Sequence, residues 1–174
     1  MQAQDNLPYK SLTEFRNDTT AFILYNFIDR AEQYKGKKLT DIAKDLEIPI
    51  KIIVPQDSRK NVVAPIYIYI WNNNIVFKMM KGDLRADFRS IILEWNEVEE
   101  DNGRTFALVR SEISEQIDFY NQFTIKNVSV VIPENSKYYE KYKPKETKSA
   151  VNYPRGLVRD ENGELVSRGV IIDR

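Results

Sequence analysis

An alternating aromatic stretch is the strongest candidate for binding chemistry in this sequence of 174 residues. Tyr67, Tyr69 and Trp71 alternate with isoleucines, so a strand would present all three rings on one face. Such a face suits a sugar or peptide ligand, because rings stack on the ligand while a few polar groups fix its orientation. We expect Lys78 and Glu94, on neighbouring strands, to supply these polar groups. The competing interpretation is that a helix packs over the rings.

An acidic segment offers carboxylates for catalysis or for calcium binding. Two carboxylates at a defined separation can cleave a glycosidic bond, and several carboxylate oxygens together can bind calcium. The calcium-loop spacing D-x-[DN]-x-[DN]-G is absent, however, and Asp101-Asn102-Gly103 is explained as a hairpin turn. Solvated charges at a strand end are the simpler interpretation, so we assign no catalytic and no metal-binding residue. The segment comprises Glu94, Glu97, Glu99, Glu100 and Asp101.

A basic and aromatic segment, residues 137–148, is similar to surfaces that bind single-stranded nucleic acid. The whole chain, however, has 26 lysines and arginines against 26 aspartates and glutamates, a formal net charge of +0. Affinity for a polyanion needs a basic excess, so we predict no nucleic-acid partner. The segment is interpreted as part of a linker or arm.

The chain contains no cysteine and no histidine, and this excludes several kinds of chemistry. Disulfide bonds, Cys/His zinc sites, nucleophiles activated by histidine and imidazole pH switches all require one of these residues. Glycine-rich phosphate loops and the G-x-S-x-G motif are absent as well. Carboxylates, tyrosines, lysines and serines remain, and no cofactor is predicted.

Helices are predicted at the N-terminus, where they would support the aromatic strand. The first follows a capping-box sequence at residues 11–14 and ends at Gly36, and the second begins at Thr40 and ends before Pro49. The apolar stripe of the first helix is formed by Leu24, Phe27, Ile28, Ala31 and Tyr34.

Period-two alternation predicts strands over the following residues. Asn72-Asn73-Asn74 is expected to form a hairpin turn between residues 66–71 and 75–79, and residues 101–103 another one before 106–109. A helix is predicted within 112–123. The further strands are 50–54, 91–95 and 125–132.

The expected fold is α+β, with N-terminal helices packed on a mostly antiparallel sheet of five or six strands and an irregular C-terminal arm. We divide the chain into a disordered N-terminus at 1–10, an α+β domain at 11–133 and a linker or arm at 134–174. Short apolar pairs on both sides of residues 160–163 fit a small hairpin in that arm. No stretch approaches the ~20 apolar residues of a transmembrane helix.

Three motifs lie in the first third of the chain: Asp18-Thr19-Thr20-Ala21-Phe22 through Asn26-Phe27, Tyr34-Lys35-Gly36-Lys37 and Asp45-Leu46-Glu47-Ile48-Pro49-Ile50-Lys51. On these motifs, this part of the chain resembles small exported proteins of unassigned function from gut bacteria. The motifs are structural, so the resemblance transfers no functional residue. It implies a periplasmic or cell-surface location, and Met1–Asp5 looks like the start of a chain whose signal peptide has been removed.

The predicted function is a non-enzymatic binding or interaction module of the bacterial cell envelope, with an unknown protein or glycan as partner. The alternative is a carboxylate-dependent glycan hydrolase. A hydrolase needs two carboxylates about 5–10 Å apart in a cleft, whereas a binding module has an open face with isolated charges. The predicted ligand-binding residues are Tyr67, Tyr69, Trp71, Lys78 and Glu94.

Overall fold

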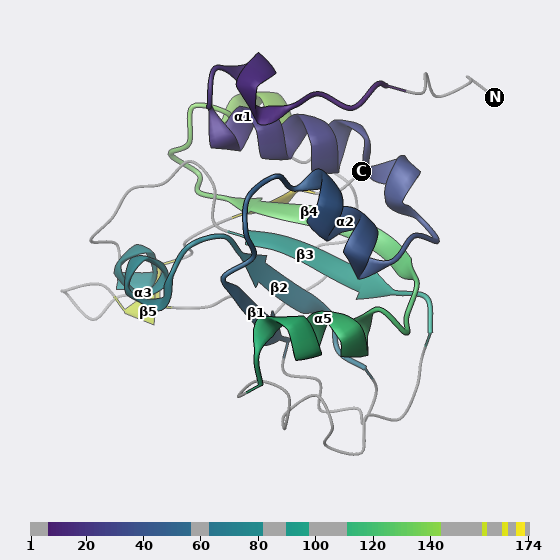
Figure 1. Cartoon of the computed structure of the whole chain (residues 1–174). Coiled ribbons are helices and arrows are strands. Elements are labelled where there is room, and N and C mark those ends of the chain that lie inside the picture. Colours follow the sequence, from purple (N-terminus) through teal and green to yellow (C-terminus); the bar gives the residue numbers. More distant parts are fainter. Residues whose placement is uncertain are drawn as a thin grey trace, which may run out of the picture.

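The protein has helices on one side of an antiparallel sheet (Figure 1). A computed structural model describes residues 7–56, 63–81, 90–97 and 111–143, together with short strands at 158–159, 165–166 and 170–172. No helix in these ranges is long and apolar enough to cross a membrane. The combination of these helices with an antiparallel sheet confirms the α+β class predicted from the sequence.

The N-terminal helical region changes its hydrogen-bonding pattern along its length. A 3₁₀ turn, η1 (Leu12–Phe15), precedes α1 (Thr19–Leu24), which continues into a π-helical turn, η2 (Tyr25–Asp29), and a second 3₁₀ turn, η3 (Ala31–Tyr34). Gly36 then ends the region with a φ of 75°, which glycine adopts without strain. The sequence pattern predicts one continuous helix here, whereas the structure divides it into α, π and 3₁₀ segments.

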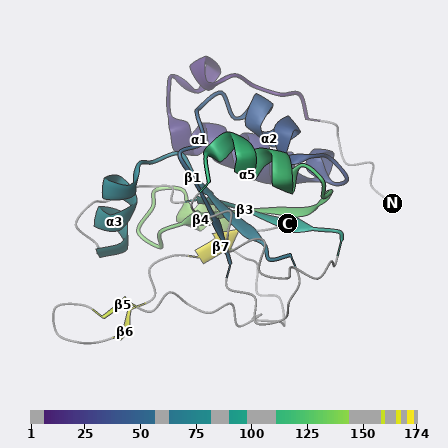
Figure 2. The ribbon, with the colours of Figure 1, turned by 60° about the horizontal axis from the view of Figure 1, so that its bottom comes forward.

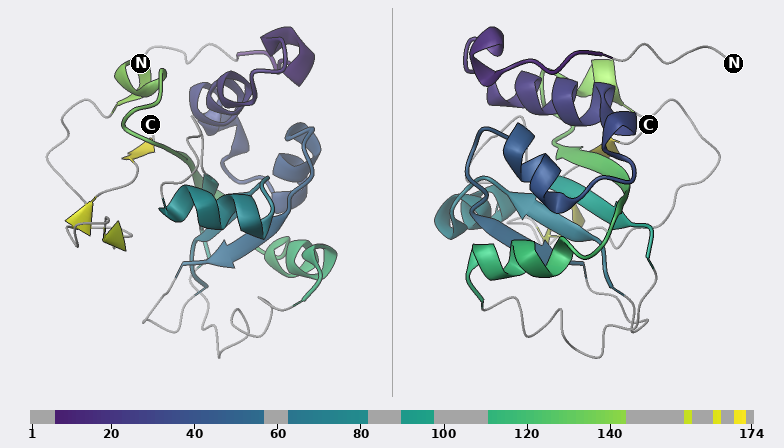
Figure 3. Two further views of the ribbon diagram at one scale, coloured as in Figure 1. Left: turned by 90° about the vertical axis from the view of Figure 1, so that its left-hand side faces the viewer. Right: turned by 45° about the vertical axis from the view of Figure 1, so that its right-hand side comes forward.

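Three more helices complete the layer around α1. The second predicted helix is present as α2 (Leu39–Asp45), and the helix predicted within 112–123 is α5 (Ile113–Tyr120). Figure 2 shows α1, α2 and α5 on the same side of the strands. The short α6 (Tyr139–Tyr142; light green in Figure 3) follows the sheet and is bonded to η2, because the hydroxyl of Tyr142 donates a hydrogen bond to Asp29 at 3.0 Å.

Four strands from the first 132 residues form the sheet. They are β1 (Ile52–Pro55), β2 (Ile66–Tyr69), β3 (Ser90–Trp95) and β4 (Ile125–Ile132), each antiparallel to the next. The short β7 (Val170–Ile172) pairs with the end of β4. In the same C-terminal part, β5 (Val158–Arg159) pairs with β6 (Leu165–Val166). The prediction of five or six strands is not confirmed, and the strand expected at 106–109 lies outside the described residues.

The hairpin predicted around Asn72–Asn74 is wrong, because residues 73–81 form the helix α3 (Asn73–Lys81). The side chain of Asn72 accepts a hydrogen bond from the backbone nitrogen of Ile75 at 3.0 Å, as a helix N-cap does. Asparagine is favourable both in turns and at helix N-caps, so the Asn run fits either structure. A short apolar alternation likewise does not separate a strand from a helix.

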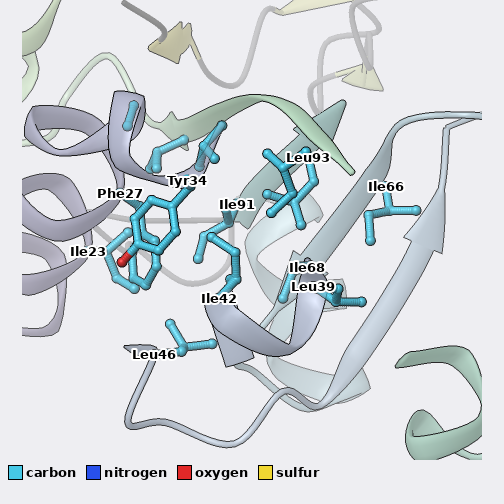
Figure 4. Close-up of a cluster of buried hydrophobic side chains, with 14 of the residues drawn as sticks. Ile23, Phe27, Tyr34, Leu39, Ile42, Leu46, Ile66, Ile68, Ile91 and Leu93 are labelled. Carbon is cyan, nitrogen blue, oxygen red and sulfur yellow. The ribbon is translucent and has the colours of Figure 1, made fainter. Parts of the chain in front are cut away.

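The hydrophobic core lies between the helices and one face of the sheet (Figure 4). Ile53, Ile68, Ile91 and Val130 are register partners across β1 to β4, and each is at most 2% exposed. All five residues of the predicted helical stripe are buried with them. From the helices, Figure 4 labels Ile23, Phe27, Tyr34, Leu39, Ile42 and Leu46 around this face.

Candidate functional site

The face of the sheet turned away from the core carries two of the predicted binding tyrosines. Register places Val54, Tyr67, Ile92 and Ser129 in one row across β1 to β4. Because these residues alternate along each strand with the core residues, their side chains lie on the opposite face. We call this the second face. By the same alternation it includes Val54, Tyr67, Tyr69, Ser90, Ile92, Glu94, Asn127 and Ser129.

Exposure along this row rises toward β1. Ile92 and Ser129 are each 3% exposed, Tyr67 is half-buried, and Val54 is 38% exposed. Tyr69, which is two residues further along β2 on the same face, is half-buried as well. The accessible part of the second face is therefore the part formed by β1 and β2, where the two tyrosines lie.

Tyr67 contributes a polar group to this part of the second face. Burial raises the pKa of Tyr67, so the phenol is neutral at physiological pH and can both donate and accept a hydrogen bond. Among the residues that the structure describes, this hydroxyl has no hydrogen-bond partner. A half-buried ring with a spare polar group can contact both the apolar and the polar part of a ligand.

Two predicted binding residues do not lie on the second face. Trp71 follows β2 in a bend and packs against the core, where its indole nitrogen is buried and has no hydrogen-bond partner among the described residues. Lys78 is exposed on α3 rather than placed on a strand. Both misplacements have the same cause, since the chain leaves the sheet after Tyr69 and enters α3. Glu94 does lie on the second face, opposite Asn127.

Polar residues of β3 and β4 on this face were missed by the sequence analysis. Asn127 donates a hydrogen bond to the hydroxyl of Ser129 at 3.3 Å, and Ser90 is only 2% exposed. The signal was present in the sequence, because Asn127 and Ser129 alternate with Val128 and Val130 within a correctly predicted strand. That alternation places the polar pair on the face opposite to the valines.

The carboxylate of Glu97 has a structural partner. It accepts hydrogen bonds from the backbone nitrogen of Thr124 at 2.7 Å and from the Thr124 hydroxyl at 2.8 Å. Desolvation acts to raise the pKa of Glu97, but the hydrogen bonds from Thr124 outweigh it and lower the pKa. A carboxyl group held ionised is unsuited to general acid catalysis. Glu99, Glu100 and Asp101 lie outside the described residues.

A second concentration of polar contacts surrounds Arg30, which is 7% exposed. Its Nε donates to the carbonyl of Leu7 at 3.0 Å, Nη1 to Asn26 Oδ1 at 3.0 Å and Nη2 to Gln33 Oε1 at 2.9 Å. Asn26 is fully buried and also donates to the carbonyl of Lys10 at 2.8 Å. We call Asn26, Arg30 and Gln33 the N-terminal clamp, because they fix residues 7–10 against the helices.

Tyr34 connects the N-terminal clamp to a negatively charged residue. Arg30 Nη1 lies 3.4 Å from the Tyr34 hydroxyl, which donates to Asp45 Oδ2 at 2.9 Å. Burial and the charge of Asp45 raise the pKa of Tyr34. Close by, Tyr9 donates to Glu47 at 2.5 Å. These contacts join residues far apart in the chain, and we assign them a structural role. Within the described part of the chain, no group of acidic residues is arranged to hold a metal ion.

Asp18 connects the N-terminus of α1 to the segment before α6. It accepts hydrogen bonds from the backbone nitrogen of Ala21 at 3.0 Å, from Lys137 Nζ at 2.8 Å and from the Tyr138 hydroxyl at 2.5 Å. Desolvation acts to raise the pKa of Asp18, but these three donors outweigh it and lower the pKa below its ordinary value.

The stability that Asp18 contributes is therefore expected to depend on pH. A lowered folded-state pKa gives stability that is present above the unfolded-state pKa, near 4, and is lost as the pH falls through the folded-state value. In Asp18→Asn the N-cap is kept and the charge is removed, so we expect a loss below about 1 kcal/mol at pH 7. Urea denaturation between pH 2 and 7 should show the two proteins converging at low pH. A constant difference across this range would contradict the assignment.

The geometry thus provides an accessible tyrosine face on β1 and β2 and a buried polar clamp at the N-terminus. Of the acidic residues, the described part of the chain places Glu94 on the second face and binds Glu97 to Thr124. No family model, no curated protein and no solved structure matches this chain.

Proposed function

We propose that the protein is a non-enzymatic binding module whose ligand contacts the second face at Tyr67 and Tyr69. One observation carries this proposal: α1, α2 and α5 lie on the other face of the sheet, while exposure on the second face increases toward these tyrosines. An aromatic surface with a few polar groups is typical of sites for glycans and peptides. The two rings are about 7 Å apart along the strand, which allows both to contact one ligand.

The chemistry of Tyr67 favours a glycan as the ligand. Sugar hydroxyl groups both donate and accept hydrogen bonds, as the neutral Tyr67 hydroxyl does. The sugar ring has apolar faces that stack on an aromatic ring. A peptide is the other class that such a surface accepts, and the experiment below separates the two.

The hydrolase alternative gains no support from the described carboxylates. Glu97 is bonded to Thr124 with a lowered pKa, and Glu94 lies on the second face opposite an asparagine. Location in the periplasm or at the cell surface is part of our proposal and rests on the resemblance of residues 18–51 to exported proteins. Fractionation of the native cells, followed by detection with an antibody, tests that part separately.

Ligand screening with a matched set of variants tests the binding proposal. We expect the unaltered protein to bind a glycan on an array of oligosaccharides, and Tyr67→Ala/Tyr69→Ala to lose at least tenfold in affinity because both stacking surfaces are removed. Tyr67→Phe keeps the ring and loses only the hydroxyl, so its loss should be smaller. Biolayer interferometry measures these affinities, and circular dichroism confirms that each variant is folded.

The control for this experiment is Lys78→Ala, which alters an exposed residue of α3 outside the sheet. It should bind as the unaltered protein does. Equal affinity in a folded Tyr67→Ala/Tyr69→Ala protein would refute the proposal. Binding to a peptide array and to no oligosaccharide would keep the site and replace the glycan with a peptide.

A further inference from the structure

We propose that the outer edge of β4 is a docking site for an extended peptide, and that β7 of the same chain occupies this site in the isolated protein. The two strands are antiparallel, with Ile132 opposite Val170, Val131 opposite Ile171 and Val130 opposite Ile172 (Figure 2). This site is separate from the second face, so the inference does not depend on the proposed glycan ligand.

The first reason is that the edge of a sheet accepts any strand of suitable sequence. Its unpaired backbone N–H and C=O groups form hydrogen bonds with a strand from the same chain or from another molecule. Recognition by strand addition takes its affinity from the main chain and its specificity from alternate side chains. The presence of β7 on this edge shows that the edge accepts a strand in the folded protein.

The second reason is that β7 covers only part of the edge. β4 extends over Ile125–Ile132, and β7 is in register with residues 130–132 alone. At the other end, the backbone of Ile125 is bonded to the turn after η3, with Gly36 N donating to Ile125 O at 2.7 Å and Ile125 N donating to Lys37 O at 2.9 Å. Residues 126–129 have no register partner in β7, so a longer strand can form additional pairs.

The third reason is the length of chain through which β7 is attached. Residues 143–169 lie between α6 and β7, and the paired strands β5 and β6 are among them. The effective concentration of a tethered strand is in the mM range for a short tether and falls as the tether lengthens. β7 forms three register pairs with β4. A free peptide that forms more pairs with β4 can therefore compete with β7 for the edge.

The register between β4 and β7 also indicates which peptides can bind to the edge of β4. Val130 and Ile132 are fully buried, and their partners in β7 are Ile172 and Val170, both β-branched. Register partners in a sheet share a face, so a competing peptide needs aliphatic residues at alternate positions to fill the same place. The occupant that we infer is an extended peptide with alternating valine or isoleucine.

A reversible lock on β7 tests this proposal in the full-length chain. Val131→Cys/Ile171→Cys places two thiols directly opposite each other, at a separation that suits a disulfide. The natural sequence has no cysteine, so no other thiol competes. The probe is a fluorescein-labelled peptide, SRGVIITVTV, which carries residues 167–172 followed by four residues that can pair with residues 126–129, and its affinity is measured by fluorescence anisotropy.

We expect the reduced variant to bind this peptide at least tenfold more tightly than the oxidised variant, because the disulfide holds β7 on the edge. A peptide of the same composition in scrambled order should bind neither form. The matched control is Ile92→Cys/Ser129→Cys, which joins β3 to β4 away from the edge, and its oxidation should leave the affinity unchanged.

Three results would overturn the proposal. Failure of the cysteines at 131 and 171 to cross-link within one chain would show that β7 does not occupy the edge. A cross-linked dimer at micromolar concentration would make a second copy the occupant instead of a peptide. Equal affinity of the reduced and oxidised forms, or no binding by the reduced form, would show that the edge is not a docking site.

Discussion

Replacing Arg30 with methionine should lower the free energy of unfolding by about 2–4 kcal/mol, because buried acceptors lose their donor. The acceptors are the Leu7 carbonyl, Asn26 Oδ1 and Gln33 Oε1. The Leu7 carbonyl keeps one donor, Gln33 Nε2 at 2.7 Å, and for this reason the expected loss is not larger. Urea denaturation measures the loss.

The same substitution should release the N-terminal segment locally. Hydrogen exchange of the amides in residues 7–12 is expected to accelerate more than that of β3, because the clamp holds this segment directly. Lys35→Met is the matched control, since Lys35 forms an exposed ion pair with Glu32 and its loss should change stability by less than about 0.5 kcal/mol. An Arg30→Met protein as stable as the unaltered one would show that the clamp carries no net stabilisation.

Trp95→Ala should lower the free energy of unfolding by about 3–5 kcal/mol, the usual range for removal of a large buried aromatic side chain. Trp95 is 6% exposed and is stacked on Tyr120, with the ring centroids 5.6 Å apart and an interplanar angle of 7°. Its ring centroid also lies 6.0 Å from that of Phe123, so Trp95 joins the end of β3 to the region of α5. Its indole nitrogen donates to the carbonyl of Ala64 at 3.1 Å. Thermal unfolding followed by circular dichroism measures the effect.

Trp71 differs from Trp95 in the hydrogen bonding of its indole nitrogen. The indole nitrogen of Trp71 is buried and, within the part of the chain that the structure describes, has no hydrogen-bond partner. Trp71→Phe removes this unsatisfied donor, so we expect the free energy of unfolding to change by less than about 1 kcal/mol. Trp95→Phe instead removes the hydrogen-bond donor of the Ala64 carbonyl. It should therefore lower the free energy of unfolding by about 1 kcal/mol more than Trp71→Phe does. Equal costs for the two substitutions would contradict this account of their hydrogen bonding.

Elements with a strong local pattern were predictable from the sequence. The strand over 125–132 is present with the bounds predicted for it, and the strand over 91–95 differs by one residue at its start. Both are rich in β-branched residues, which favour a strand over a helix. The start of α2 after Gly36 and its end before Pro49 follow from equally local signals.

The binding face could be predicted only in part, because its composition depends on where β2 ends. Tyr67, Tyr69 and Trp71 have identical spacing, yet the chain turns toward α3 after Tyr69 and takes Trp71 to the core side. Nothing local marks this turn, since the Asn run that follows fits a hairpin as well as a helix start.

The N-terminal clamp was not predictable for a different reason. One partner of Arg30 is the backbone carbonyl of Leu7, in the segment predicted as a disordered N-terminus, and a backbone acceptor leaves no mark in the sequence. The spacing of Asn26 and Arg30, four residues apart among buried apolar residues, was the available signal. A polar pair on the buried side of a helix requires partners, because unpaired buried polar groups are costly.

The hydrogen bonds between residues 36–40 and 121–125 constrain the order in which this chain can fold. Besides the Gly36 contact with Ile125, Lys38 donates to the carbonyl of Gln122 at 3.1 Å and Thr40 to Asn121 at 3.0 Å. A ribosome needs roughly 5–20 s to add the residues that separate these two segments. Until then the helical segments before residue 40 have no β4 on which to bury their apolar side chains. Assembly of this half of the core therefore follows synthesis of most of the chain, and during that interval the apolar side chains of these helical segments lack their partner strand.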